Sequence, residues 1–268
     1  MEDESTQILS IQENDDDEET FFAELAEVPI DPPAKRDTCS SCGRPVSVGL
    51  CRFFPKERIP IDSCVYIIQH PNEEKRLLRT VPILTSCLPP GKCQVIKGKR
   101  FSEKSYPELA KLCSSPNTIV LFPGPDAIDI NELPVPPPST NGHSQGYNIL
   151  VMDGTWHQAT SIFKANAMFQ IPQQVQFTNS GSSEYTIRTQ PLDSTVCTVE
   201  SAAIALSVLE RNPEIREILA KPLRAMCQFQ MNHGAVVHHS KEYLKAHPEL
   251  PQYKSWLPRK NEPSHDKS

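Results

Sequence analysis

The sequence lacks the short motifs that mark several large enzyme classes. It has 10 glycines in 268 residues but no G-x-G-x-x-G fingerprint, no P-loop and no H-E-x-x-H pair. A Rossmann dehydrogenase, a P-loop NTPase or a zincin would each need one of these motifs to hold phosphate or zinc. One glycine follows an apolar run in "FPGPDA" (122–127), which fits a nucleotide-binding loop and a plain turn equally well.

Long apolar runs and a basic, then apolar, N-terminal leader are also missing. A membrane span needs about 20 apolar residues, and a secretory signal needs that leader, so we expect neither. The nine cysteines are odd in number and spread along the chain. This usage is typical of reduced thiols in an intracellular protein of the nucleus or cytoplasm.

Basic residues are absent from one end of the chain. Residues 1–31 contain 12 acidic residues and no lysine or arginine. Because the whole chain has 33 acidic and 27 basic residues, residues 32–268 hold 21 acidic against 27 basic ones, a charge of about +6. We predict a disordered acidic tail over 1–31. The basic body suits a polyanionic partner, although ordinary surface lysines would give the same excess.

Strand-like and helical segments alternate along the body. The pattern predicts strands at 63–70, 92–98, 118–124, 147–153, 173–177 and 184–188, and helices at 156–169, 198–210 and 213–234, the last kinked at Pro222. Residues 73–84 read as a helix or turn broken near Pro82, and 131–146 as a surface loop. The alternation predicts an α/β fold, with a mostly parallel sheet covered by helices on both faces. We divide the chain into the tail, a cysteine-rich segment at 32–60, a catalytic domain at 61–245 and a basic tail at 246–268.

Two segments carry candidate binding residues. Cys39 and Cys42 form a C-x-x-C pair with Cys51 nine residues later, which suits a tetrahedral zinc site. Its fourth ligand would be Cys64, His70 or another residue, and buried cysteines in a loop would give the same pattern. The second segment, 91–101, gathers basic residues beside Phe101, as RNA contacts would and as a solvated strand face also would: Lys92, Lys97, Lys99 and Arg100.

An acidic residue, Asp153, ends the best predicted strand. Ligands of open parallel sheets bind in the crevice beyond the carboxyl ends of the strands, and Gly154 would allow a close backbone approach. A helix N-cap would explain the same aspartate. An N-cap does not require the tryptophan that follows at position 156.

Two ordered signatures relate the chain to a known family. The first is Asp153-Gly154-Thr155-Trp156, continued by Gln158-Ala159, and the second is Cys197-Thr198-Val199-Glu200, followed by "SAA". The segments "QHPNEE", "RTVP", "LFPG", "YTIRTQP" and "FQMNHG" frame them in order. Over about residues 38–240 the chain resembles the DTW-domain tRNA-uridine aminocarboxypropyltransferases of the TDD superfamily.

The resemblance implies the transfer of the 3-amino-3-carboxypropyl group of S-adenosyl-L-methionine to N3 of a uridine in the tRNA D-loop. Methylthioadenosine is the by-product, and the core is similar to the knotted SPOUT methyltransferases. The chain departs from the family pattern twice, with Gly49 in place of a cysteine and Cys197 in place of a serine. We expect contacts to the S-adenosyl-L-methionine co-substrate from six residues: Leu121, Pro123, Gly124, Arg188, Thr198 and Glu200.

The chemistry suggests a role for four residues. Asp153 would take the proton from uridine N3 as a general base. Arg188 would hold the carboxylate of the transferred arm and Glu200 its ammonium, while Trp156 would stack on the base or close the pocket. Two alternatives remain open: an RNA methyltransferase on the same fold, which would release S-adenosylhomocysteine, and a non-enzymatic zinc-containing RNA-binding module.

Overall fold

The computed structural model describes residues 37–134, 146–178 and 180–252. All elements named below belong to one compact unit, Thr38–Ser268. The predicted acidic tail, the centre of the 131–146 loop and most of the predicted basic tail lie outside the described residues. The proposed division into domains stays a prediction.

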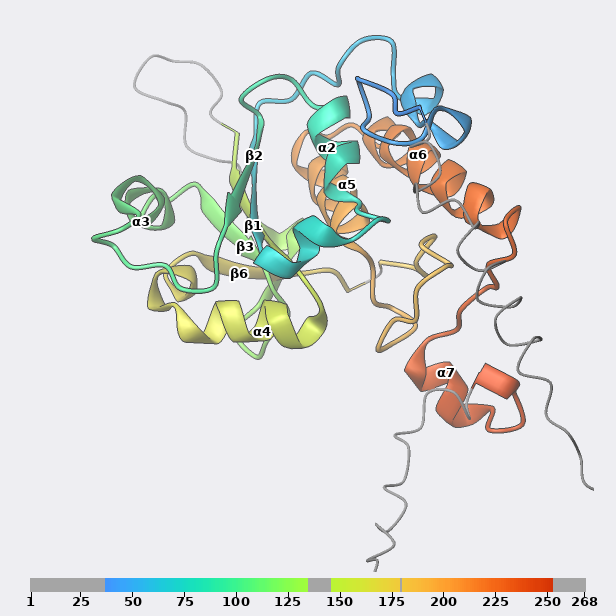
Figure 1. The fold of residues 1–268 in the computed structure, drawn as a ribbon. Coiled ribbons are helices and arrows are strands. Elements are labelled where there is room, and N and C mark those ends of the chain that lie inside the picture. Colours follow the sequence, from blue (N-terminus) through green and yellow to red (C-terminus); the bar gives the residue numbers. More distant parts are fainter. Residues whose placement is uncertain (1–36, 135–145, 179, 253–268) are drawn as a thin grey trace, which may run out of the picture. The chain divides into compact units, whose positions relative to one another are not determined.

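A six-stranded sheet in the order β2-β1-β5-β3-β6-β4 forms the centre of this unit (Figure 1). Every pairing in it is parallel, which confirms the predicted sheet. Five of the six predicted strands are present, and the two-residue β4 is an addition. The strands are β1 (Cys64–Gln69), β2 (Cys93–Lys97), β3 (Thr118–Leu121), β4 (Ile128–Asp129), β5 (Asn148–Asp153) and β6 (Gln173–Gln176).

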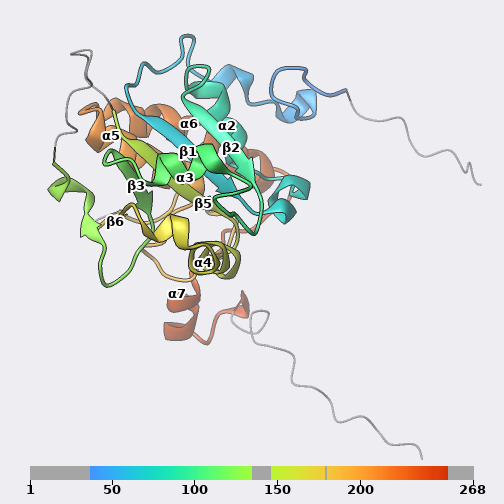
Figure 2. The ribbon, with the colours of Figure 1, turned by 90° about the vertical axis from the view of Figure 1, so that its left-hand side faces the viewer.

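Helices cover both faces of the sheet, as predicted (Figures 1 and 2). Along β5, Ile149 and Val151 join a core with α2, α5 and α6, whereas Leu150 and Met152 join a second core with α3 and α4. Burial on both sides explains why β5 is a continuous apolar run. The helices are α2 (Val81–Cys87), α3 (Pro107–Cys113), α4 (Trp156–Ala165), α5 (Thr198–Leu209), α6 (Glu214–Met231) and α7 (Lys241–Ala246). Short 3₁₀ turns are η1 (Val46–Val48), η2 (Cys51–Phe53), η3 (Pro71–Lys75), η4 (Ile130–Glu132) and η5 (Ala167–Gln170).

Two predictions about local structure were wrong. Residues 184–188 form turns rather than a strand, because side-chain partners replace a strand ladder there: the Glu184 amide donates to Glu200 Oε1 at 2.6 Å. Pro82 does not break a helix but stands in the first turn of α2, where its missing N–H is not needed. Pro222 lies inside the continuous helix α6.

The strand order creates a switch point at β5. From β1 the chain adds β2 on one side and later places β3 two positions away on the other side. It then inserts β5 between β1 and β3. Such a reversal opens a crevice at the carboxyl ends of the central strands. At this edge Gln69, the last residue of β1, lies in register with Asp153, the last residue of β5. The knot that the resemblance implies stays a prediction.

Candidate functional site

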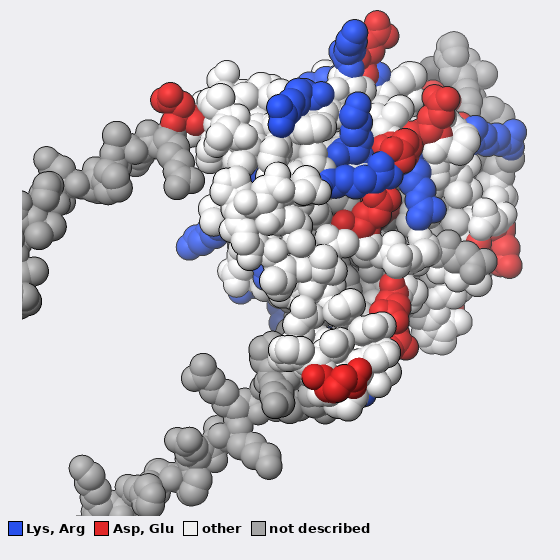
Figure 3. Space-filling model, turned by 90° about the vertical axis from the view of Figure 1, so that its right-hand side faces the viewer, with Lys and Arg blue, Asp and Glu red and all other residues white. Residues whose placement is uncertain are grey.

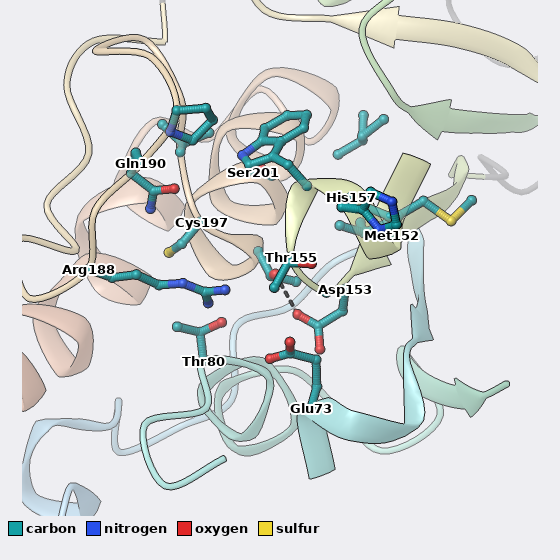
Figure 4. Close-up of a pocket in the computed structure, with 18 of the residues that line it drawn as sticks. Glu73, Thr80, Met152, Asp153, Thr155, His157, Arg188, Gln190, Cys197 and Ser201 are labelled. Carbon is teal, nitrogen blue, oxygen red and sulfur yellow. Dashed lines mark hydrogen bonds between the residues drawn. The ribbon is translucent and has the colours of Figure 1, made fainter. Parts of the chain in front are cut away.

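A pocket of about 520 Å³ lies at this edge of the sheet (Figure 4). Its walls come from the segments after β1, β3 and β5, from the first turn of α5 and from the 188–191 loop. The predicted crevice and the two sequence signatures therefore meet in one cavity.

Asp153 is held at the floor of this pocket by two donors. Its residue is 7% exposed. Gln69 Nε2 donates to Oδ2 at 2.8 Å, and Thr198 Oγ1, from the first residue of α5, donates to Oδ1 at 2.6 Å. The carboxylate also gains from the partial positive charge at the amino end of that helix. Since each carboxylate oxygen has two lone pairs, both can still accept a proton or hydrogen bond from a ligand.

In the D-G-T-W segment, one residue caps a helix and others line the pocket. Thr155 is the N-cap of α4: its Oγ1 accepts from the Gln158 amide at 3.2 Å, and Gln158 Oε1 accepts from the Thr155 amide at 2.8 Å. Asp153 is therefore not the cap, which removes the alternative explanation for it. A Cβ on Gly154 would lie 3.0 Å from Gln158 Cβ, so the glycine keeps this junction tight. Trp156 lines the pocket and is 42% exposed.

A second buried carboxylate, Glu73, lines the same pocket and was missed from the sequence. It is 5% exposed and stands on η3, which begins where the His70 Nδ1 accepts from the Asn72 amide at 3.2 Å. Burial raises the pKa of Glu73, and the negative charge of Asp153 adds to this, while Arg76 and Arg188 oppose it. The sequence does place Glu73 four residues after the end of a buried strand, which could have marked it as a site residue. The adjacent Glu74, which is exposed, made the pair look like ordinary surface acids.

The predicted cofactor residues divide into two groups. Leu121, Pro123, Arg188 and Thr198 line the pocket. Gly124 is not among the lining residues, and a Cβ there would lie 2.8 Å from Gln174 Oε1.

Glu200 is also absent from the pocket lining, since its carboxylate has other partners. It accepts from the Cys197 amide and from Ser183 Oγ at 2.7 Å each, besides the Glu184 amide. The first of these bonds belongs to the capping box of α5, which forms with Cys197 in the serine position. Glu200 thus fixes the turn at 183–185 and the start of α5.

The predicted RNA-binding residues lie outside the pocket lining. Lys92 precedes β2 at the opposite end of the sheet and donates to the Asp62 carbonyl at 2.5 Å, whereas Lys97 ends β2 and pairs with Glu74 at 2.5 Å. Arg100 donates to the Ala165 carbonyl at 3.4 Å. Burial, the larger cause, and the positive charge of Lys99 both lower the pKa of His70.

The pocket itself has basic residues that the sequence did not single out. Arg76, Arg79 and Lys241 join Arg188 among its lining residues. On the face shown in Figure 3, lysine and arginine side chains alternate with acidic ones and do not form a continuous basic patch. The pocket lining therefore holds four basic residues against two acidic ones, Glu73 and Asp153.

Cys39, Cys42 and Cys51 come together as predicted. Their sulfur atoms all lie within 4.8 Å of one another, and within the described residues no further histidine, cysteine or acid joins this group. Hydrogen bonds from the Cys42 and Ser41 amides and from the other two thiols lower the pKa of Cys39 to about 7, which favours the metal-binding thiolate. A Cβ on Gly49 would lie 3.9 Å from Cys42 Sγ, so the position of the missing family cysteine borders the cluster.

The fold and the pocket define an α/β protein with a polar, charged binding site at the switch point of a parallel sheet. Comparison with known proteins then gives the family: the DTW domain matches residues 36–231, and the chain belongs to this family. It is 46% identical over 220 residues to tRNA-uridine aminocarboxypropyltransferase 2 of Macaca fascicularis, covering 82% of this chain and 72% of that protein. The protein of the same name from Drosophila melanogaster is 39% identical over 237 residues (88% and 91%).

A more distant relative is tRNA-uridine aminocarboxypropyltransferase A of Arabidopsis thaliana, 26% identical over 225 residues, which cover 73% of this chain and 81% of that protein. No solved structure matches the chain. None of the helices in the described ranges combines the length and apolar character that a membrane span requires.

Proposed function

We propose that the protein is a tRNA-uridine aminocarboxypropyltransferase that uses S-adenosyl-L-methionine as donor and modifies N3 of a D-loop uridine. One observation carries this proposal. Asp153 and Thr198, which belong to the two family signatures, share a 2.6 Å hydrogen bond in the floor of a pocket of about 520 Å³. The names of the relatives supply the reaction class.

The reaction requires a base and an aligned carbon. Asp153 accepts the proton of uridine N3, whose electron pair then attacks Cγ of the aminocarboxypropyl arm. The N3–Cγ bond forms as the Cγ–S bond breaks, and its electron pair stays on sulfur in methylthioadenosine. Gln69 and Thr198 orient the Asp153 carboxylate before the uridine arrives, which supports this role.

Selection of this carbon over the donor's methyl group is a matter of positioning. Arg188 lines the pocket, and no ion pair joins its guanidinium to an acid anywhere in the described part of the chain. It is thus free to bind the carboxylate of the arm through two parallel hydrogen bonds. Leu121 and Pro123 supply apolar lining, and the half-exposed Trp156 offers a surface for base stacking.

Arg76, Arg79 and Lys241 line the pocket and are partly or fully exposed, and they would meet the phosphates of the approaching tRNA. Lys97, Lys99 and Arg100 would extend contacts along the end of β2, and Lys92 would touch only RNA that reaches the far side of the sheet. Phosphate contacts of this kind position an RNA without reading its sequence.

Cys39, Cys42 and Cys51 would supply three of the four ligands of a zinc ion, with the fourth from outside the cluster. Such an ion would hold the 38–53 segment together and takes no part in the transfer. All nine cysteines are free thiols, which supports an intracellular setting in the nucleus or cytoplasm.

The base assignment is tested with Asp153→Asn. Transfer from S-adenosyl-L-methionine to tRNA at saturating donor should fall about a hundredfold or more, because the amide cannot take the proton. Donor affinity, measured by calorimetry, should remain. Asp126→Asn, at an exposed aspartate outside the pocket, is the matched control and should keep full activity. Wild-type transfer by Asp153→Asn would show that another group is the base.

A further inference from the structure

Glu73 is a carboxylate for which the proposed reaction, as described so far, has no use. Within the described part of the chain, Glu73 and Asp153 are the acidic residues that line the pocket. Asp153 is engaged by Gln69 and Thr198 and serves the uridine. Glu200 is committed to backbone amides and Ser183 outside the pocket.

The Glu73 side chain lacks a full set of partners. Arg76 Nε lies 3.0 Å from Oε1, but Oε1 receives no properly aligned hydrogen bond from any described group. Glu73 as a whole is only 5% exposed. The ion pair with Arg76 offsets part of the cost of burial, and the carboxylate, with two lone pairs on each oxygen, keeps acceptor capacity for a donor group of a ligand.

Charge in the pocket favours a cationic ligand group at this point. In Figure 4 the carboxylates of Glu73 and Asp153 lie next to each other, and the guanidinium of Arg188 points toward them from the opposite wall. Burial raises the pKa of Glu73, and the charges of Arg76, Asp153 and Arg188 act on the same carboxylate, in keeping with this arrangement. An acid and an unpaired arginine facing one cavity match the ammonium and carboxylate of an α-amino acid head group.

We propose that Glu73 binds the α-ammonium of the donor's aminocarboxypropyl arm while Arg188 binds its carboxylate. This inference rests on the proposed function and gives Glu73 the place that the sequence suggested for Glu200. With both ends of the head group held, Cγ rather than the methyl carbon faces the uridine. Glu73 is thus a donor-binding residue that determines which group is transferred.

Three adenosyl compounds test this assignment by calorimetry with the full chain. S-adenosyl-L-methionine carries the ammonium and a sulfonium, S-adenosylhomocysteine carries the ammonium without the sulfonium, and methylthioadenosine carries neither. Glu73→Gln should weaken binding of the first two by about tenfold or more, as expected for loss of a charged hydrogen bond. It should leave methylthioadenosine binding unchanged.

The control is Glu74→Gln, next in sequence. Glu74 is 54% exposed in its side chain, pairs with Lys97 and does not line the pocket, so all three affinities should stay at wild-type values. Glu73→Asp, which keeps the charge on a shorter side chain, should retain more affinity than Glu73→Gln. Methylthioadenosine binding also reports that each variant is folded.

Distinct outcomes would overturn the inference. Equal weakening of all three compounds by Glu73→Gln would assign Glu73 a structural role, and weakening of S-adenosyl-L-methionine alone would place it beside the sulfonium. Unchanged affinities would remove Glu73 from donor binding altogether. These results would leave the proposed function standing, whereas a wild-type protein that binds none of the three would refute that function and this inference together.

Discussion

Three glutamate and aspartate side chains near the pocket differ in the donors that reach them, and this difference sets their roles. Asp153 receives two side-chain hydrogen bonds and still faces the cavity. Glu200 receives backbone and hydroxyl donors and serves the cap of α5. Glu73 is buried, and its Oε1 forms an ion pair with Arg76 at 3.0 Å but receives no aligned hydrogen bond. A residue held at a cost to the fold is characteristic of a binding or catalytic site.

The buried charge of Glu73 predicts how stability depends on pH. Because burial raises the pKa of Glu73, the folded protein binds this proton more tightly than the unfolded chain does. Its favourable contribution is complete below the ordinary glutamate pKa and is lost as pH rises through the raised folded value. Glu73→Gln avoids that loss. It should increase the free energy of unfolding at pH ~8 by on the order of 1 kcal/mol, with a smaller gain at pH ~4.5.

Urea unfolding of both proteins without donor measures this effect at each pH. Glu73→Gln also removes the attraction of Arg76 and Arg188 and the repulsion of Asp153, so the measured gain is the net effect of burial and these three charges. A destabilised Glu73→Gln protein at the higher pH, or an identical gain at both, would contradict the assigned cost of burial.

Among the elements, two junctions carry the site: the one from β5 to α4 and the first turn of α5. Thr155 caps α4 with its own side chain, which leaves Asp153 to project from the strand end. Thr198 then connects α5 to β5 across 45 residues of sequence. Each helix begins where its cap is satisfied, so the geometry of the pocket follows from local rules at both helix starts.

We predict that a cysteine at position 49 strengthens zinc binding by the cysteine segment. This residue has φ −65° and ψ 140°, which any residue adopts, and a Cβ there would lie 3.9 Å from Cys42 Sγ. Gly49→Cys should therefore supply a fourth thiolate and tighten zinc binding about tenfold or more. The same Cβ would come 3.3 Å from the Val46 carbonyl oxygen, which requires a small local shift.

Zinc affinity is measured by competition with a chelating dye. Gly49→Ser introduces a side chain of similar size that binds zinc poorly, so it separates the thiolate from the added bulk. Equal zinc affinity of the Cys and Ser variants would show that position 49 does not reach the metal.

At the scale of the whole molecule, the sequence predicted the α/β architecture with its mostly parallel sheet. Parallel strands buried on both faces have continuous apolar runs, so β1, β3 and β5 were recognisable. Their spatial order was not, because it depends on crossovers between distant segments. Residues 184–188 were predicted as a strand because apolar residues alternate at Tyr185 and Ile187. These side chains pack against the core from a turn, without strand–strand hydrogen bonds.

Some of the residues in and near the pocket could be identified from the sequence, and others could not. Asp153 and Thr198 were identified because motifs mark them, and the fold brings them into contact. Glu200 belongs to a motif as well, but only the capping geometry shows that its carboxylate turns away from the pocket. Glu73 and Arg76 lie in a charged stretch that resembles a solvated surface in sequence. The burial of Glu73 and its pairing with Arg76 depend on η3, which follows His70, and the His70 amide donates to the Asp153 carbonyl at the end of β5.

The most direct test of the central claim is to identify what becomes of the donor. Purified protein is incubated with tRNA and S-adenosyl-L-methionine, and the by-product and the digested nucleosides are quantified by mass spectrometry. The proposed function predicts methylthioadenosine and N3-aminocarboxypropyl uridine in equal amounts. S-adenosylhomocysteine with a methylated nucleoside, or an unmodified tRNA with the donor intact, would contradict it.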